Sequence, residues 1–181
     1  MRTIRVGAIA RIEGEAALHL EMRGAGGGFD VFIAGKKVGA TGKAIGVDMT
    51  PEMLAKARKN IGTYHERTGL NNVEFRLGEI EHLPVADSSV DVIISNCVIN
   101  LAADKRDVLR EAFRVLRPGG RFAVSDVVTR GEIPAEIRKN VLLWVGCVAG
   151  ALDENEYRAK LAAAGFDAIG IEPTRVYRAE D

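Results

Sequence analysis

The sequence has few cysteines, no long apolar run and no excess of charge of either sign. Its 181 residues include only Cys97 and Cys147, too few for the disulfide framework of a small secreted domain. No apolar run approaches the ~18 residues that a membrane-spanning helix requires. The first residues contain Arg and Glu where a secretory signal requires an unbroken apolar stretch. We therefore expect a cytoplasmic, reducing setting with both cysteines as thiols, and no membrane partner.

The charge balance argues against a nucleic-acid partner. Lys and Arg together number 25, as do Asp and Glu, so the formal net charge is zero. Nucleic-acid-binding domains usually concentrate basic charge on one face, and the basic cluster at residues 56–59 lies on an expected helix, where it reads as the solvated side. His19, His65 and His82 lack the spacing of metal ligands.

Strand-like and helix-like segments alternate from residue 16 onward. We expect strands at 16–22, 43–47, 73–77, 90–95, 121–128 and 166–171, and helices at 29–38, 50–67, 104–117, 134–148 and from 153. Three of these helix starts are supported by capping residues: a hydroxyl N-cap at Thr50 followed by Pro51, an N-cap at Asp104, and a capping-box spacing from Asp153 to Glu156. This alternation predicts a doubly wound, mostly parallel α/β sheet. With no repeat or linker, residues 1–181 are expected to form one domain.

A glycine-rich stretch marks a candidate nucleotide site. Gly24, Gly26, Gly27 and Gly28 lie between an expected strand and an expected helix, where glycines allow a tight turn and a close approach of backbone N–H groups to a ligand. Alone, such a stretch fits a flexible turn equally well. Asp48 follows Gly28 by 20 residues at the end of the next strand, the spacing at which an acid meets a ribose hydroxyl.

Four longer segments carry a continuous resemblance to a known family. They are GFDVFIAGKKVGATGKAIGVDMTPEMLAKARKN, VEFRLGEIEHLPVADSSVDVIISNCVINLAADK, REAFRVLRPGGRFAVSDVV and LLWVGCVAGALDENEYRAKLAAAGFDAIGIEPTRVY. Over residues 24–180 the chain resembles the arsenite S-adenosylmethionine methyltransferases, which have a Rossmann-like fold. The resemblance implies S-adenosylmethionine as cofactor, a trivalent arsenical as substrate and a thiol reductant as partner.

The resemblance also implies roles for individual residues. Those that would contact the cofactor are Gly24, Gly26 and Gly28 at its methionine part, Asp48 at the ribose hydroxyls, Met49 on the adenine, Ile80 and Glu81 at the adenine edge, and Asn96 near the sulfonium. Read without the family, the alternative for Glu81 is a solvated loop acid, and the alternative for Asn96 is a capping residue.

Cys97 and Cys147 are the implied arsenic ligands. Taken alone, two separate cysteines are more often small buried hydrophobic residues. The segments SNCVINL and GCVAG, however, resemble those that supply arsenic-binding cysteines in the family. As(III) is a soft centre that prefers thiolate ligands, and its lone pair can act as the nucleophile in an in-line displacement. The transfer therefore requires no general base.

Both ends of the chain depart from the family pattern. Met22 and Arg23 stand where an acid usually precedes the glycine loop, and the family's further arsenic-binding cysteine is absent. Residues 1–20 faintly resemble the opening of nickel–iron hydrogenase large subunits, but without Cys-x-x-Cys pairs they indicate no hydrogenase function. After Asp181 the family continues into a last antiparallel strand. We expect the sheet to lack that strand, and an unpaired edge to favour a homodimer.

Three functions remain in competition. The leading hypothesis is methyl transfer to arsenite or methylarsenite. A methyltransferase for another small molecule, acting on a carbon or oxygen nucleophile, would leave Cys97 and Cys147 as packing residues. A non-catalytic remnant would bind only cofactor or arsenical, or pair with a fuller subunit.

Overall fold

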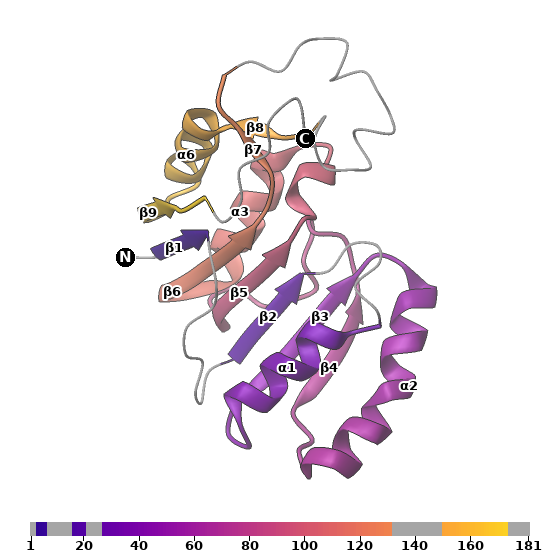
Figure 1. The fold of residues 1–181 in the computed structure, drawn as a ribbon. Helices are drawn as coiled ribbons and strands as arrows, with labels where there is room; N and C mark the ends of the chain where they lie inside the picture. The colour runs from indigo at the N-terminus through magenta and orange to yellow at the C-terminus, as the bar shows by residue number, and fades with distance from the viewer. Residues whose placement is uncertain (1–2, 7–15, 21–26, 132–149, 174–181) are drawn as a thin grey trace.

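A computed structural model describes residues 3–6, 16–20, 27–131 and 150–173 (Figure 1). Its main sheet has seven strands in the order β4-β3-β2-β5-β6-β1-β9, and every neighbouring pair is parallel. The strands are β1 (Thr3–Val6), β2 (Ala16–Leu20), β3 (Lys43–Asp48), β4 (Val73–Leu77), β5 (Val90–Asn96), β6 (Leu116–Ser125) and β9 (Asp167–Ile171). This confirms the predicted parallel α/β sheet. Within the described strands of this sheet, none is antiparallel.

Helices cover both faces of the sheet. They are α1 (Phe29–Val38), α2 (Pro51–Thr68), α3 (Lys105–Val115) and α6 (Glu154–Ala163), with a 3-10 turn η1 (Ile99–Leu101) and a two-stranded ribbon of β7 (Val128–Thr129) and β8 (Leu152–Asp153). Side chains of β5 alternate between two cores. Val92 and Ile94 pack with α1 and α2, while Ile93 packs with α3 and α6. No helix in the described ranges is long and apolar enough to cross a membrane.

Within the main sheet, strand β1 is the element that the sequence pattern did not predict. It pairs with β6 on one side and with β9 on the other (Figure 1). The pairing of Ile4 with Phe122 and with Ile169 fixes its position. The place between β6 and β9 is therefore filled by an N-terminal strand, and the free edges of the described sheet are β4 and β9.

Several predicted boundaries need correction. Strand β6 begins at Leu116 rather than Arg121, because the Pro-Gly-Gly segment at residues 118–120 belongs to the strand, with a register shift between Val90 and Val92 of β5. It ends at Ser125, and β7 follows separately. Thr50 is the N-cap of α2, but its hydroxyl makes no capping bond. The helix predicted at 134–148 lies outside the described residues. Asp104 and Asp153 do cap α3 and α6 through side-chain oxygens.

The core between the sheet and α3 generates the first prediction. Phe122 is fully buried, and its ring stacks on that of Phe166 with centroids 5.6 Å apart. Phe122→Ala should lower the free energy of unfolding by about 3–5 kcal/mol, because it removes buried ring contacts and leaves a cavity that the surrounding core fills only in part. Phe29→Ala, at a residue that is 65% exposed, should change it by less than about 0.5 kcal/mol. Urea unfolding of both variants measures this, and equal losses would contradict the assignment of the core.

Candidate active site

The glycine turn before α1 is shaped by packing against the sheet. Gly28 is the N-cap of α1 with φ 88°, in the left-handed region, and Gly27 has φ 77°. A Cβ on Gly28 would lie 2.5 Å from Cζ of Phe75 on β4, so no other residue fits without displacing that ring. The start of α1 thereby lies close to the sheet, with the N–H groups of its first turn near the carboxyl edge. Gly24 and Gly26 lie outside the described residues.

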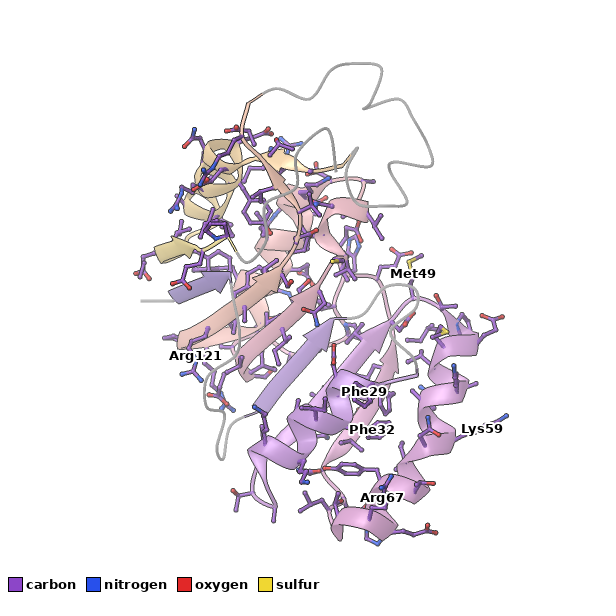
Figure 2. All side chains as sticks on the ribbon, in the orientation of Figure 1. Phe29, Phe32, Met49, Lys59, Arg67 and Arg121 are labelled. Carbon is purple, nitrogen blue, oxygen red and sulfur yellow. The ribbon has the colours of Figure 1, made fainter. Side chains whose placement is uncertain are left out.

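Asp48 closes β3 at the same edge. Its side chain is 4% exposed, and Oδ1 accepts a hydrogen bond from the Thr50 N–H at 2.7 Å. A carboxylate has more acceptor positions than this one bond uses, so it can still accept bonds from hydroxyl groups of a ligand. Next to it, Met49 (Figure 2) is 46% exposed, and Leu77 at the end of β4 is 55% exposed. Two exposed apolar side chains beside a buried acid suit a flat, partly apolar ligand.

The turn after β4 places the two predicted adenine-edge residues differently. Ile80 is 1% exposed and belongs to the core, whereas Glu81 is partly exposed. The turn is closed by a hydrogen bond from the His82 N–H to the Glu79 carbonyl at 3.1 Å. Of the predicted pair, only Glu81 therefore offers an accessible side chain here.

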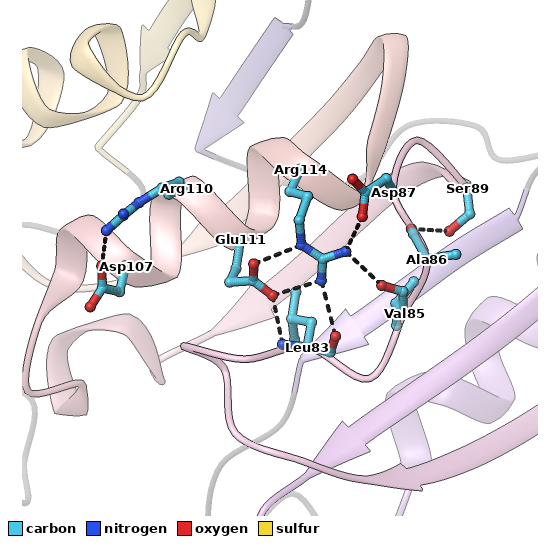
Figure 3. A network of polar contacts seen from close by, with 9 residues as sticks. All are labelled: Leu83, Val85, Ala86, Asp87, Ser89, Asp107, Arg110, Glu111 and Arg114. Atoms are coloured by element: carbon cyan, nitrogen blue, oxygen red, sulfur yellow. Dashed lines mark hydrogen bonds and ion pairs between the residues drawn. The ribbon is translucent and has the colours of Figure 1, made fainter.

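Arg114 on α3 anchors the chain that follows this turn (Figure 3). Its guanidinium donates to the carbonyls of Leu83 at 3.1 Å and Val85 at 2.9 Å, and it pairs with Asp87 and Glu111. Glu111 in turn accepts from the Leu83 N–H at 2.8 Å. Arg114 lowers the pKa of Glu111, and Glu111 raises the pKa of Arg114, so both stay charged. Sequence reasoning missed this network, because Asp87 and the two carbonyls lie 27 or more positions before Arg114 in the chain.

Asn96 and Asp30 join two elements across the edge. Asn96 ends β5, and its Nδ2 donates to Oδ2 of Asp30, in the first turn of α1, at 2.9 Å. Asn96 was predicted as a site residue, and Asp30 was not. An acid in the first turn of the helix after a glycine loop was the available signal.

Cys97 has an unusual backbone. Its φ is 53°, in the left-handed region that residues with a Cβ seldom adopt, and its N–H donates to the Ser125 carbonyl at 2.8 Å. The residue is exposed. Partial burial of the sulfur, together with the negative charge of Asp126, raises the pKa of the thiol. Backbone strain at an exposed cysteine on the ligand-binding edge of a parallel sheet supports a functional role.

Cys147 lies outside the described residues, but Gly150, three positions later, is described. Gly150 is buried against Asn100: an added Cβ would overlap the Asn100 carbonyl oxygen and lie 3.1 Å from the carbonyl carbon. Gly150 thus meets the turn that follows Cys97. Within residues 3–6, 16–20, 27–131 and 150–173, no group of three or more His, Cys, Asp or Glu side chains is arranged to hold a metal ion.

Comparisons with known proteins place the chain among methyltransferases. A family model described as a methyltransferase domain matches residues 23–165. The chain is 51% identical over 164 residues to an arsenite methyltransferase of Halobacterium salinarum, covering 91% of this chain and 40% of that protein. It is 41% identical to the human arsenite methyltransferase, covering 79% of this chain and 40% of that protein. The chain therefore spans well under half the length of these curated relatives.

Solved structures give the same result. The chain superposes with a TM-score of 0.80 and 42% identity on an arsenic(III) S-adenosylmethionine methyltransferase from Chlamydomonas reinhardtii, covering 87% of this chain and 54% of that one. A methyltransferase from Aquifex aeolicus described as SAM-dependent matches at 26% identity with a TM-score of 0.61, covering 84% of this chain and 72% of that one.

The Arg114 network generates the second prediction. Arg114→Ala removes several charge-assisted hydrogen bonds at once and should lower the free energy of unfolding by about 2–3 kcal/mol. The Leu83 and Ser88 amides should also exchange faster with solvent. Arg110→Ala is the matched control, because Figure 3 draws Arg110 paired with Asp107 on the exposed side of α3. This substitution should lower the free energy of unfolding by less than about 0.5 kcal/mol. Unchanged exchange in Arg114→Ala would show that the network does not hold this segment.

Proposed function

Because the chain belongs to the methyltransferase domain family, we propose that it transfers a methyl group from S-adenosylmethionine to trivalent arsenic bound by cysteine thiolates. The observation that carries this proposal is the exposed, strained Cys97 beside Asn96 at the carboxyl edge of the sheet. The arsenite methyltransferases at 51% and 41% identity support the choice of substrate. We treat residues 1–181 as one domain with this activity.

The polar and apolar groups at this edge of the sheet suit S-adenosylmethionine. Asp48 would accept hydrogen bonds from the ribose hydroxyls, and Met49 and Leu77 would cover the adenine, with Glu81 at its edge. The N–H groups of the glycine turn, which contains Gly24, Gly26 and Gly28, and the Asn96 carboxamide would face the methionine part. Asp30 would keep Asn96 oriented through the 2.9 Å hydrogen bond. When bound, S-adenosylmethionine supplies a methyl group on a positively charged sulfur.

Cys97 and Cys147 would hold the arsenic as thiolates. The raised pKa of Cys97 favours the thiol before an arsenical binds, so the arsenical would displace the thiol proton as the As–S bond forms. Cys147 precedes Gly150 by three residues, and a connection of that length reaches at most about 11 Å. The contact between Gly150 and Asn100 therefore supports two thiolates that converge on one arsenic atom.

The thiolates would point the arsenic lone pair at the methyl group. That lone pair forms the As–C bond, while the electrons of the broken S–C bond stay on the departing sulfur. Arsenic is thereby oxidised formally from As(III) to As(V). Two equivalents of an external thiol, oxidised to a disulfide, return it to As(III). Such a reductant implies a reducing compartment, which we propose to be the cytoplasm. Self-association as a homodimer stays a prediction, and it rests on the free edge strand β9.

Replacing Asp48 tests the cofactor site. Asp48→Ala should weaken S-adenosylmethionine binding about 10- to 100-fold, because an ionic acceptor of two hydroxyl groups is lost. Isothermal titration measures this, with Asp107→Ala on the exposed side of α3 as the control that keeps wild-type affinity. A dissociation constant unchanged in Asp48→Ala would mean that the ribose binds elsewhere.

Replacing Cys97 tests the substrate. One equivalent of phenylarsine oxide should protect both thiols of the wild type from alkylation by iodoacetamide, as read by mass spectrometry. In Cys97→Ser the protection of Cys147 should be lost, since a hydroxyl is a poor ligand for a soft centre. Methyl transfer should be lost with it, while binding of S-adenosylmethionine is retained. Full protection of Cys147 in the variant would exclude Cys97 as a ligand and favour another small-molecule substrate. Binding of both compounds without turnover in the wild type would instead indicate a non-catalytic protein.

A further inference from the structure

Asp30 lies where two parts of the proposed cofactor site meet. It stands in the first turn of α1, two residues after Gly28, and its Oδ2 accepts a hydrogen bond from Nδ2 of Asn96 at 2.9 Å. Asn96 ends β5 and directly precedes Cys97. Asp30 is partly exposed, and Asn96 and Cys97 are exposed, so a ligand at this edge can approach all three. The carboxylate therefore connects the start of α1 with the residue beside the cysteine.

The proposed reaction restricts where the sulfonium of the cofactor can lie. For transfer, the methyl carbon must come within about 3.5 Å of the arsenic atom, and that atom would be bonded to the sulfur of Cys97. The methionine part, on the other side of the sulfonium, would face the N–H groups of the glycine turn before α1. The sulfonium would thus lie between Cys97 and the start of α1, and this is the interval that Asn96 and Asp30 span.

The start of α1 needs a negative charge if it is to face a cation. The N–H groups of a first helical turn carry a partial positive charge, about half of an elementary charge in all, which attracts a carboxylate and repels a positively charged sulfur. Asp30 is the acid in that turn, whereas the basic residues Lys36 and Lys37 lie in the last turn of α1. The carboxylate of Asp30 therefore offsets the repulsion at the end of α1 where the sulfonium would lie.

Three further acids at this edge have other partners. Asp48 closes β3 and is assigned to the ribose hydroxyls, and Glu81 is assigned to the adenine edge. Asp126 accepts hydrogen bonds from the Asn100 N–H at 3.1 Å and from the N–H of the residue that follows it at 2.9 Å. These backbone donors balance the charge of Asp126 within its own turn. Asp30 is instead bonded to the neighbour of Cys97, so its charge is the one that best fits the sulfonium.

We propose that Asp30 recognises the positive charge of the sulfonium and so shifts the preference of the site toward S-adenosylmethionine and away from its product, S-adenosylhomocysteine. The inference rests on the proposed function, in which Asp30 is a specificity-determining residue. Methyl transfer leaves the cofactor sulfur neutral, because the electrons of the broken S–C bond stay on that sulfur. The attraction to Asp30 is then lost, and the product is held only by contacts that both molecules share. Release of the spent cofactor is thereby favoured.

Asp30→Asn tests this proposal, because it removes the charge and keeps an oxygen that can accept the Asn96 hydrogen bond. Isothermal titration should show S-adenosylmethionine binding weakened about tenfold and S-adenosylhomocysteine binding changed by less than about twofold. Sinefungin, in which a carbon bearing an ammonium group replaces the methylated sulfur, should lose affinity together with S-adenosylmethionine. Asp107→Asn is the matched control, since Asp107 is the first-turn acid of α3, and it should leave all three affinities unchanged.

The alternatives give different results. An equal loss for S-adenosylmethionine and S-adenosylhomocysteine would overturn the proposal, because Asp30 would then act only on Asn96 or on the methionine amino group, which both ligands carry. Unchanged affinity for all three ligands would overturn it as well, and both results leave the proposed methyl transfer standing. If Asp30→Asn does not fold, Asp30→Ser replaces it with the same expected results. Wild-type protein that binds no S-adenosylmethionine would remove the proposed function itself, and this inference with it.

Discussion

Parallel pairing from β3 through β2 and β5 to β6 places the carboxyl ends of all four strands along one edge of the sheet. Asp48 and Asn96 end two of these strands, Cys97 follows one, and Asp126 follows another. Helical crossovers on both faces make this arrangement possible, because a parallel strand requires a long return connection. Reversing one strand would carry its functional residue to the opposite edge. The parallel direction of the strands is therefore the condition that brings the site residues together, and the individual contacts follow from it.

Sequence reasoning predicted those features in which the local residue pattern alone determines the structure. The alternation of apolar strands with amphipathic helices predicted the sheet and its two helical layers, because both faces of a parallel sheet must be buried. The spacing from Gly28 to Asp48 predicted which acid closes β3. Aspartates before α3 and α6 predicted the caps that the structure contains. In each case the residue that the local pattern favours is also the residue that the whole fold requires at that position.

Features that depend on contacts between distant segments escaped prediction. Strand β1 is only four residues long, and its place between β6 and β9 depends on pairing with residues more than 100 positions away. The left-handed backbone of Cys97 and the contact of Gly150 with Asn100 leave no periodic signal. Arg114 reads as an ordinary surface arginine, because its carbonyl partners are invisible in sequence. The sequence shows a glycine at position 150, but only its contact with Asn100 explains why a larger residue does not fit there.

The proposed function requires two sulfur atoms bound to one arsenic atom at this edge of the sheet. X-ray absorption at the arsenic edge, on wild-type protein carrying one equivalent of phenylarsine oxide, counts those neighbours directly. We predict two sulfur atoms bound to arsenic in the wild type and one in Cys97→Ser. A single sulfur in the wild type, or an identical spectrum for the two proteins, would contradict the assignment of Cys97 and Cys147 as a joint arsenic site.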